Sequence, residues 1–219
     1  AQAGRLGSFF VDVREVTNKE YKRFVDAGGY RRKEYWTEPF ERNGKTLSWD
    51  EAMALFRDAS GRPGPAGWQT GSYEAGTQDL PVTGVSWYEA AAYAAFAGKR
   101  LPSVYHFAVA SARVVGGDFL PASNFSNKLA PAGTYRGGLN YWGLYDAAGN
   151  AREWCSNAAA GQRFALGGAA DGPAYMFWNT DLSLRSPFDR NPTTGFRCIK
   201  PVAPDARDAL LASPVVAKP

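Results

Sequence analysis

Three stretches in the first half of the chain show the polar-to-apolar pattern that predicts the start of a helix. Each begins with Ser or Thr, carries Glu three residues later and continues with apolar residues, which in the first stretch (Tyr21, Phe24 and Val25) have i, i+3 and i+4 spacing. They are Thr17-Asn18-Lys19-Glu20, Ser48-Trp49-Asp50-Glu51 and Ser86-Trp87-Tyr88-Glu89. Such a capping box satisfies two backbone amides at the helix N-terminus. A fourth helix is predicted from Ser103 to Ala112, which gives three to four short helices.

The pattern changes from Phe119 onward, where turn-forming residues separate short β-prone stretches. These predicted strands are Thr134-Tyr135, Tyr141 to Tyr145, Arg152 to Cys155, Arg163 to Leu166 and Phe196 to Ile199. Early helices followed by an irregular sheet indicate an α+β fold. Because no internal boundary stands out, we expect one domain over residues 1–202. The Ala/Pro-rich tail, residues 203–219, is either disordered or an arm laid on a partner.

Two connections carry further signals. Asn43-Gly44 predicts a tight turn between the first two helices. Residues 60–84 form a long Gly- and Pro-rich loop, which we expect to be packed down because it holds Trp68 and Tyr73. The chain has 24 Gly, 14 Pro and 7 Trp. We therefore expect a loop-rich fold in which large aromatic side chains hold irregular backbone in place.

Charge and hydropathy narrow the classes of partner. The net charge is +4, but basic residues alternate with acids, as in Tyr30-Arg31-Arg32-Lys33-Glu34. A nucleic-acid-binding protein would gather them on one face, so we expect no nucleic-acid partner. No apolar run is long enough to predict a transmembrane segment. The start Ala1-Gln2-Ala3 suits the end left by signal peptidase, although a trimmed chain would look the same. We expect a periplasmic or extracellular location.

Five motifs in series resemble the formylglycine-generating-enzyme (sulfatase-modifying-factor) family. The order and spacing match from about residue 8 to 200. Some longer stretches look closest to a bacterial branch that is often fused to protein kinases. The resemblance implies a C-type-lectin-like fold with little regular secondary structure. The motifs are Val16-Thr17-Asn18-Lys19-Glu20-Tyr21, Pro81 to Ala90, Gly98-Lys99-Arg100-Leu101-Pro102, Gly143 to Trp154, and Gly195-Phe196-Arg197-Cys198.

The resemblance also shows what this chain lacks. Enzymes of the family oxidise a substrate cysteine with copper, held by two cysteines just after a Gly-Gly-Ser segment. Soft thiolates are the ligands that select Cu(I). The matching segment, Gly167 to Met176, contains no Cys, and Ala169 replaces the Ser. We therefore expect no copper and no oxidase activity, and a structural role for Cys155 and Cys198, either as one disulfide or as two buried thiols.

A sister branch of the family holds non-haem iron with several histidines. This chain has only His106, which we expect to be a helix-face or core residue, so we expect no iron. Ser/His/Asp catalysis would also need His106 as its base, and the chain has no Gly-x-Ser-x-Gly nucleophile motif.

One metal site carries over from the family by position. Its calcium ligands, a side-chain oxygen, two backbone carbonyls and a Glu, fall on Asp146, Gly149, Ala151 and Glu153. Several oxygens around a tight turn suit a hard cation such as calcium. The alternative is a turn that is closed by hydrogen bonds or sodium. A second family calcium site would begin near Asn124-Phe125, and we expect it to be absent.

These expectations favour a non-catalytic binding or structural module, such as an accessory protein-binding subunit of a larger exported or membrane-associated complex. The family's substrate groove would become a protein-binding surface, although core packing is the alternative for its aromatic side chains. Its predicted lining is Trp68, Tyr73, Tyr175, Phe177, Trp178 and Asn179. The alternatives are an enzyme of altered chemistry that uses Arg185 in the old groove, or the sensor domain of a kinase-like system. Arg185 would otherwise form a structural ion pair with Asp181 or Asp189.

Overall fold

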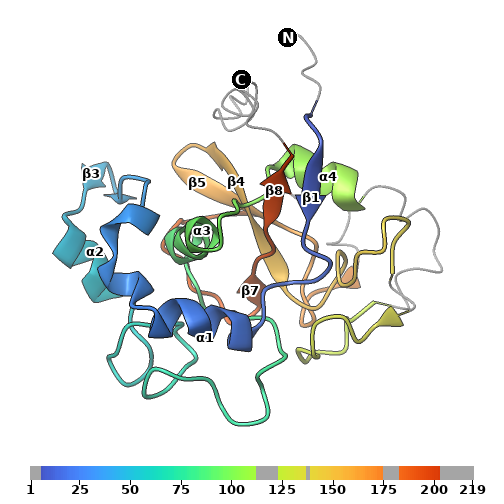
Figure 1. Ribbon diagram of the computed structural model, residues 1–219, viewed down its shortest axis with the longest axis horizontal. Coiled ribbons are helices and arrows are strands. Elements are labelled where there is room, and N and C mark those ends of the chain that lie inside the picture. The colour runs from blue at the N-terminus through green and yellow to red at the C-terminus, as the bar shows by residue number, and fades with distance from the viewer. Residues whose placement is uncertain (1–5, 112–122, 137–138, 175–182, 203–219) are drawn as a thin grey trace.

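The computed structural model describes residues 6–111, 123–136, 139–174 and 183–202, and Figure 1 shows its arrangement. Its helices are α1 (Asn18–Asp26), α2 (Trp49–Leu55), α3 (Trp87–Phe96) and α4 (Val104–Ser111), with 3-10 turns η1 (Gly29–Arg31) and η2 (Lys33–Tyr35). Its strands are β1 (Phe9–Val11), β2 (Glu41–Arg42), β3 (Lys45–Thr46), β4 (Arg152–Ala159), β5 (Gln162–Leu166), β6 (Ser183–Arg185), β7 (Thr194–Gly195) and β8 (Ile199–Pro201). This mixture confirms the predicted α+β class.

The three predicted capping boxes all form at the predicted residues. The backbone N–H groups of Thr17, Ser48 and Ser86 donate to the Glu carboxylates three residues later, at 2.9, 2.7 and 2.8 Å. The predicted fourth helix is α4, whose first turn is capped by the Ser103 hydroxyl at 3.2 Å from His106 N. Ala112, the predicted end of this helix, lies outside the described residues.

Three small sheets organise the strands. The largest has the order β6-β5-β4-β7, in which β4 pairs antiparallel with β5 and parallel with β7. β1 and β8 pair antiparallel, with Phe9 opposite Pro201, and thereby join the two ends of the domain beside α4 (Figure 1). β2 and β3 form a hairpin whose turn residues, Asn43 and Gly44, both have positive φ. This confirms the predicted turn.

Three predicted strands are wrong. Thr134-Tyr135 is irregular backbone, and Tyr141 to Tyr145 is a turn followed by bends. Of the predicted strand Phe196 to Ile199, only Ile199 lies in a strand, because β7 ends at Gly195 and β8 begins at Ile199. Asn140 explains the second, because its side-chain oxygen accepts from Trp142 N and Leu144 N, both at 3.0 Å. A short polar side chain that bonds to nearby backbone competes with strand pairing.

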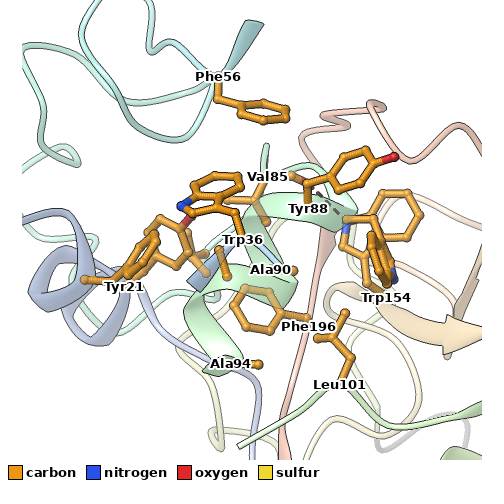
Figure 2. Close-up of a cluster of buried hydrophobic side chains, with 14 of the residues drawn as sticks. Tyr21, Trp36, Phe56, Val85, Tyr88, Ala90, Ala94, Leu101, Trp154 and Phe196 are labelled. Atoms are coloured by element: carbon orange, nitrogen blue, oxygen red, sulfur yellow. Dashed lines mark hydrogen bonds between the residues drawn. The ribbon is translucent and has the colours of Figure 1, made fainter. Parts of the chain in front are cut away.

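The main hydrophobic core surrounds α3 and is unusually aromatic (Figure 2). Trp36 stacks on Phe56 at 5.4 Å between ring centroids, and Tyr21 stacks on Tyr93 at the same distance. Trp154 of β4 is completely buried, and its indole N–H donates to Val85 O at 3.0 Å. Rigid aromatic rings therefore hold the irregular connections against α3.

The long loop between α2 and α3 is packed down, as predicted. The Asp58 carboxylate accepts hydrogen bonds from the backbone N–H groups of Ser60, Arg62 and Gly71. Trp68 is buried against the core, and its indole N–H donates to the Asn18 side chain at 3.1 Å. In the described ranges, none of the helices has both the length and the apolar composition needed to cross a bilayer.

Candidate functional site

The segment that corresponds to the family's copper-binding region is buried and hydrogen-bonds to the loop around Gly149. Gly149 N donates to Gly167 O at 2.7 Å, and Ala170 N donates to Asn150 O at 2.8 Å. Ala169 and Ala170 are buried, and the segment contributes no sulfur. In its described part, residues 167–174, the segment therefore offers backbone groups, small side chains and Asp171, and none of the sulfur ligands that copper would need.

The two cysteines are free thiols in different parts of the core, so the disulfide alternative does not apply. Cys198 belongs to the main aromatic cluster, whereas Cys155 packs with Phe107, Phe164 and Leu166. Burial raises the pKa of both thiols well above their usual value. Since the thiolate is the form that binds metals and reacts, neither cysteine has the properties of a copper ligand.

This burial gives a direct prediction for thiol reactivity. The native protein should not react measurably with a thiol reagent such as dithionitrobenzoate at about pH 8, because both groups are buried and protonated there. In concentrated guanidinium, the same protein should titrate two thiols per chain. Fast modification of one thiol in the native protein would contradict the structural role assigned to the pair.

A buried polar centre lies where the Asp146 turn meets the N-terminal strand region. Arg197 donates to both Glu153 oxygens at 2.7 Å through Nε and Nη2, and Nη2 also donates to Tyr145 O at 2.9 Å. Both side chains of this ion pair are almost completely buried. The Glu153 carboxylate is therefore held by a bidentate guanidinium, the strongest of the common charge-assisted arrangements.

Two other carboxylates in this centre are only half satisfied. Glu15 Oε1 accepts from the Asn150 side-chain amide at 3.0 Å, and Asp146 Oδ2 accepts from Gly133 N at 2.6 Å. Glu15 Oε2 and Asp146 Oδ1 are buried and have no hydrogen-bond partner among the described residues. Burial, followed by the nearby Asp146 charge, raises the pKa of Glu15, and burial raises that of Asp146.

The predicted calcium residues can now be placed. Asp146, Gly149 and Ala151 lie on one buried turn that leads into β4, and Glu153 is the second residue of that strand. Asp146 suits a cation because one of its oxygens lacks a partner, whereas both Glu153 oxygens already accept from Arg197. Across the described residues, no group of three His, Cys, Asp or Glu side chains is arranged to hold a metal. The four residues therefore fit calcium only in part.

The predicted aromatic binding surface is wrong for Trp68. This side chain is only 4% exposed and belongs to the core, because its indole N–H has a buried partner in Asn18. Tyr73 is half-buried and packs edge-on against Trp68. The other four members, Tyr175, Phe177, Trp178 and Asn179, lie outside the described residues.

Arg185 and His106 both have local partners. Arg185 pairs with Asp189 at 2.9 Å, and Asp181, the other predicted partner, lies outside the described residues. His106 Nδ1 lies 2.6 Å from Ser103 Oγ and accepts from Ser103 N at 3.2 Å. His106 thus takes the place that Glu has in the other capping boxes, and its ring packs edge-on against Phe9. This Ser–His contact belongs to the start of α4.

A groove that sequence analysis missed lies between two hairpins. The β2–β3 hairpin forms one wall, the β4–β5 turn forms another, and residues 186–188 close the end, around a volume of ≈700 Å³. Its floor includes Tyr88 and Phe188, whose rings pack 4.9 Å apart. Its lining also carries both signs of charge, from Glu38, Glu41, Arg42 and Arg163. Several short segments far apart in sequence meet here, and no single motif could have revealed it.

The lectin-like arrangement of short helices and small sheets, with a buried acidic turn leading into the central strand, defines the sulfatase-modifying-factor class of domain. The chain belongs to this family: residues 1–202 match the Sulfatase-modifying factor enzyme 1-like domain. The resemblance inferred from the five motifs is thereby confirmed.

Curated relatives include enzymes and an inactive protein. The chain is 29% identical to the serine/threonine-protein kinase pkn1 of Chlamydia caviae, with 90% of this chain and 34% of that protein covered. It is 30% identical to hercynine oxygenase of Mycolicibacterium thermoresistibile, with 65% and 34% covered. It is 28% identical to the inactive C-alpha-formylglycine-generating enzyme 2 of Mus musculus, with 87% and 74% covered. The chain thus spans about a third of the first two proteins.

The fold is also that of known structures. PvdO from Pseudomonas aeruginosa superimposes with a TM-score of 0.62 at 18% sequence identity, with 89% of this chain and 80% of that chain covered. This likeness confirms the predicted fold.

Proposed function

We propose that this chain is a non-catalytic binding domain that holds an extended polypeptide segment of a protein partner in the groove between the β2–β3 and β4–β5 hairpins. The observation that carries the proposal is this groove of ≈700 Å³, with an aromatic floor and charges of both signs. Its size falls within the range of about 300–1,000 Å³ common for binding sites.

The sequence supports a role without the family's oxidase chemistry. Residues 167–176 offer no cysteine, and the two cysteines elsewhere are buried thiols with raised pKa. A relative whose name states that it is inactive supports the idea that such domains persist without catalysis. A fold can keep its core while its loops take on other tasks.

The lining of the groove favours a polypeptide. Pro39, Tyr88 and Phe188 offer apolar contact area, while Glu41 and Arg42 stand on the β2 side as charged groups of opposite sign. Arg42 lies over the Phe188 ring at 5.7 Å, which leaves its guanidinium near the floor. A polyanion would be repelled by the two glutamates, whereas a chain that carries both charges and one large apolar side chain matches the lining.

Two measurements test whether the chain is a binding domain or an enzyme. The purified chain, supplied with Cu(I) and a cysteine-containing peptide, should consume no thiol above the rate without protein. The complex isolated from native cells should contain a protein partner, and a cross-link from that partner should fall on residues of the groove. Catalytic turnover of the peptide, or cross-links that avoid the groove, would overturn the proposal.

A charge reversal in the groove provides the sharper test. Arg42→Glu should weaken the affinity for the identified partner by about tenfold or more, because it replaces the attractive charge beside Phe188 with a repulsive one. Lys19→Glu is the matched control, since Lys19 is exposed on α1, outside the groove. Affinity is read by titration calorimetry. Equal affinities for the two variants would rule out the groove as the binding surface.

The relatives suggest the setting of such a partner. Matching regions occur within proteins named as serine/threonine kinases, so we also propose that the domain works inside a larger assembly, as an accessory or sensor unit. We retain an exported or membrane-associated complex as the proposed location. An enzyme of altered chemistry is less well supported, because Ser103 and His106 are engaged in the start of α4 and Arg185 is paired with Asp189.

A further inference from the structure

A second cavity lies beside the groove and against α3. Its volume is ≈240 Å³, and its walls come from α3, β4, β8 and the start of α4. Most of its surface is apolar and is contributed by side chains such as Trp87, Leu101 and Ile199. A cavity of about 150 Å³ with an apolar lining can hold a benzene ring. The space against α3 is therefore large enough for one side chain of the size of Leu, Met or Phe.

The sequence of α3 explains why this space is open. Trp87, Ala91 and Ala95 are spaced four residues apart, so they share one face of the helix. The two alanines are too short to fill the space that the Trp87 ring borders. That ring is fixed, because its indole N–H donates to Cys155 O at 2.9 Å and the Arg163 guanidinium lies over it at 3.6 Å. A wall that is already ordered lowers the cost of binding.

The cavity and the groove are neighbours that share a boundary. Glu38 lines both of them. Trp87 lines the cavity, and Arg163, which lies over the Trp87 ring, lines the groove. A polypeptide segment that lies in the groove can therefore reach the cavity by passing Glu38.

Glu38 gives this boundary a negative charge that is open to a ligand. Its side chain is 48% exposed, and its ion pair with Arg163 is long, at 3.8 Å. Arg163 is held more closely by Ser156, whose carbonyl accepts from its Nη1 at 2.7 Å. Lys99, a basic residue of the cavity lining, pairs with Asp12 instead. A cationic side chain of a ligand would therefore find an exposed carboxylate at the boundary.

We propose that the cavity against α3 is a second subsite of the groove, which binds one large apolar side chain of the partner segment, and that Glu38 selects a Lys or Arg beside it. The inference rests on the polypeptide ligand proposed for the groove and adds its composition. One large apolar residue lies over Phe188, another fills the cavity, and a basic residue lies between them. Burying a side chain of this size strengthens binding by about ten- to a hundredfold.

Selection from a peptide library tests this composition on the full-length chain. The probes are synthetic peptides of about nine residues, which span about 30 Å when extended. Wild type should select a Lys or Arg between two large apolar residues. Ala91→Phe, which fills the cavity from α3, should lose the preference for one of the two apolar residues and keep the other. Glu38→Gln should lose the preference for the basic residue. Ala54→Phe, the same substitution at an exposed site on α2, should select as wild type does.

Calorimetry with a selected peptide separates a filled subsite from general damage. Replacing the cavity-side apolar residue of the peptide by Ala should weaken binding to wild type by about ten- to a hundredfold. The same replacement should cost nothing further in Ala91→Phe, because the subsite is already closed. Non-additivity of this kind identifies two groups that interact directly. If Ala91→Phe does not fold, Ala95→Leu fills the same cavity with a smaller side chain and takes its place.

The outcomes distinguish failure of the subsite from failure of the groove. Wild-type selection and affinity in both folded cavity variants would overturn the subsite, whereas a loss of affinity in Arg42→Glu would leave the groove in place. A change in self-association alone in Ala91→Phe would assign the cavity to a contact between copies of the chain. If wild type selected no peptide, the polypeptide ligand proposed for the groove would be wrong, and the subsite with it.

Discussion

Replacing Arg190 with Met is expected to lower the free energy of unfolding by about 3–5 kcal/mol. Its Nε and Nη2 donate to the two oxygens of Glu89 at 2.9 and 3.0 Å. Its remaining N–H groups donate to the backbone carbonyls of Leu55, Arg57 and Gly64, so all five donors are used. One side chain thus joins α3, the end of α2 and the long loop.

The expected loss is large because of what would remain. Glu89 is completely buried and also accepts from Tyr30 Oη at 2.7 Å and Ser86 N at 2.8 Å. Without Arg190, its negative charge would stay in the core without a counter-ion. Removing one partner of a buried pair is far more costly than the pair's own net contribution.

Denaturant unfolding measures this loss, and Arg185→Met is its matched control. Arg185 also pairs with an acid, but its side chain and that of Asp189 are 22% and 33% exposed, so the pair is screened by solvent. The control should lose about 1 kcal/mol or less. If Arg190→Met were no more destabilising than Arg185→Met, the contacts of Arg190 would not stabilise the fold as argued.

Local chemistry explains which parts of the fold could be predicted from sequence. A capping box needs only four consecutive residues, and an Asn-Gly turn needs only two residues that tolerate positive φ. The helix starts at Thr17, Ser48 and Ser86 and the hairpin at Asn43-Gly44 were therefore correct. Where local rules conflicted, prediction failed: Tyr141 to Tyr145 is rich in β-formers, but the preceding Asn140 holds it as a turn.

Burial and long-range pairing could not be predicted in the same way. Trp68 lies in a Gly- and Pro-rich loop, a position typical of exposed residues, yet its partner Asn18 lies 50 positions away. Arg190 and Glu89 are 101 positions apart, and Arg197 and Glu153 are 44 apart. The one available signal for Glu15 was its position directly before the apolar Val16 and the first capping box. That signal does not identify Asn150 or Asp146 as neighbours.

Substituting Gly149 with Ala is the second change for which we expect a large effect, a loss of about 3–5 kcal/mol in unfolding free energy. Gly149 has φ +78°, and a Cβ there would lie 2.4 Å from Asn124 O and 3.0 Å from Asn124 C. Because these are backbone atoms, no side-chain rotation could relieve the overlap. The same carbonyl accepts from Asn150 N at 2.9 Å, so moving it would also break the contact that positions Asn150.

Gly143→Ala separates the two causes of this expected loss. Gly143 has nearly the same φ, +76°, on the same segment, but a Cβ there would meet no atom within 4 Å. The control should therefore show only the left-handed backbone cost, about 1–2 kcal/mol, and the excess in Gly149→Ala measures the close approach to Asn124. Denaturant unfolding of both variants in chelator gives that difference without any contribution from a bound ion. If the two losses were equal, the buried turn would have room for a side chain, and tight packing would not be what holds Asn150 against Glu15.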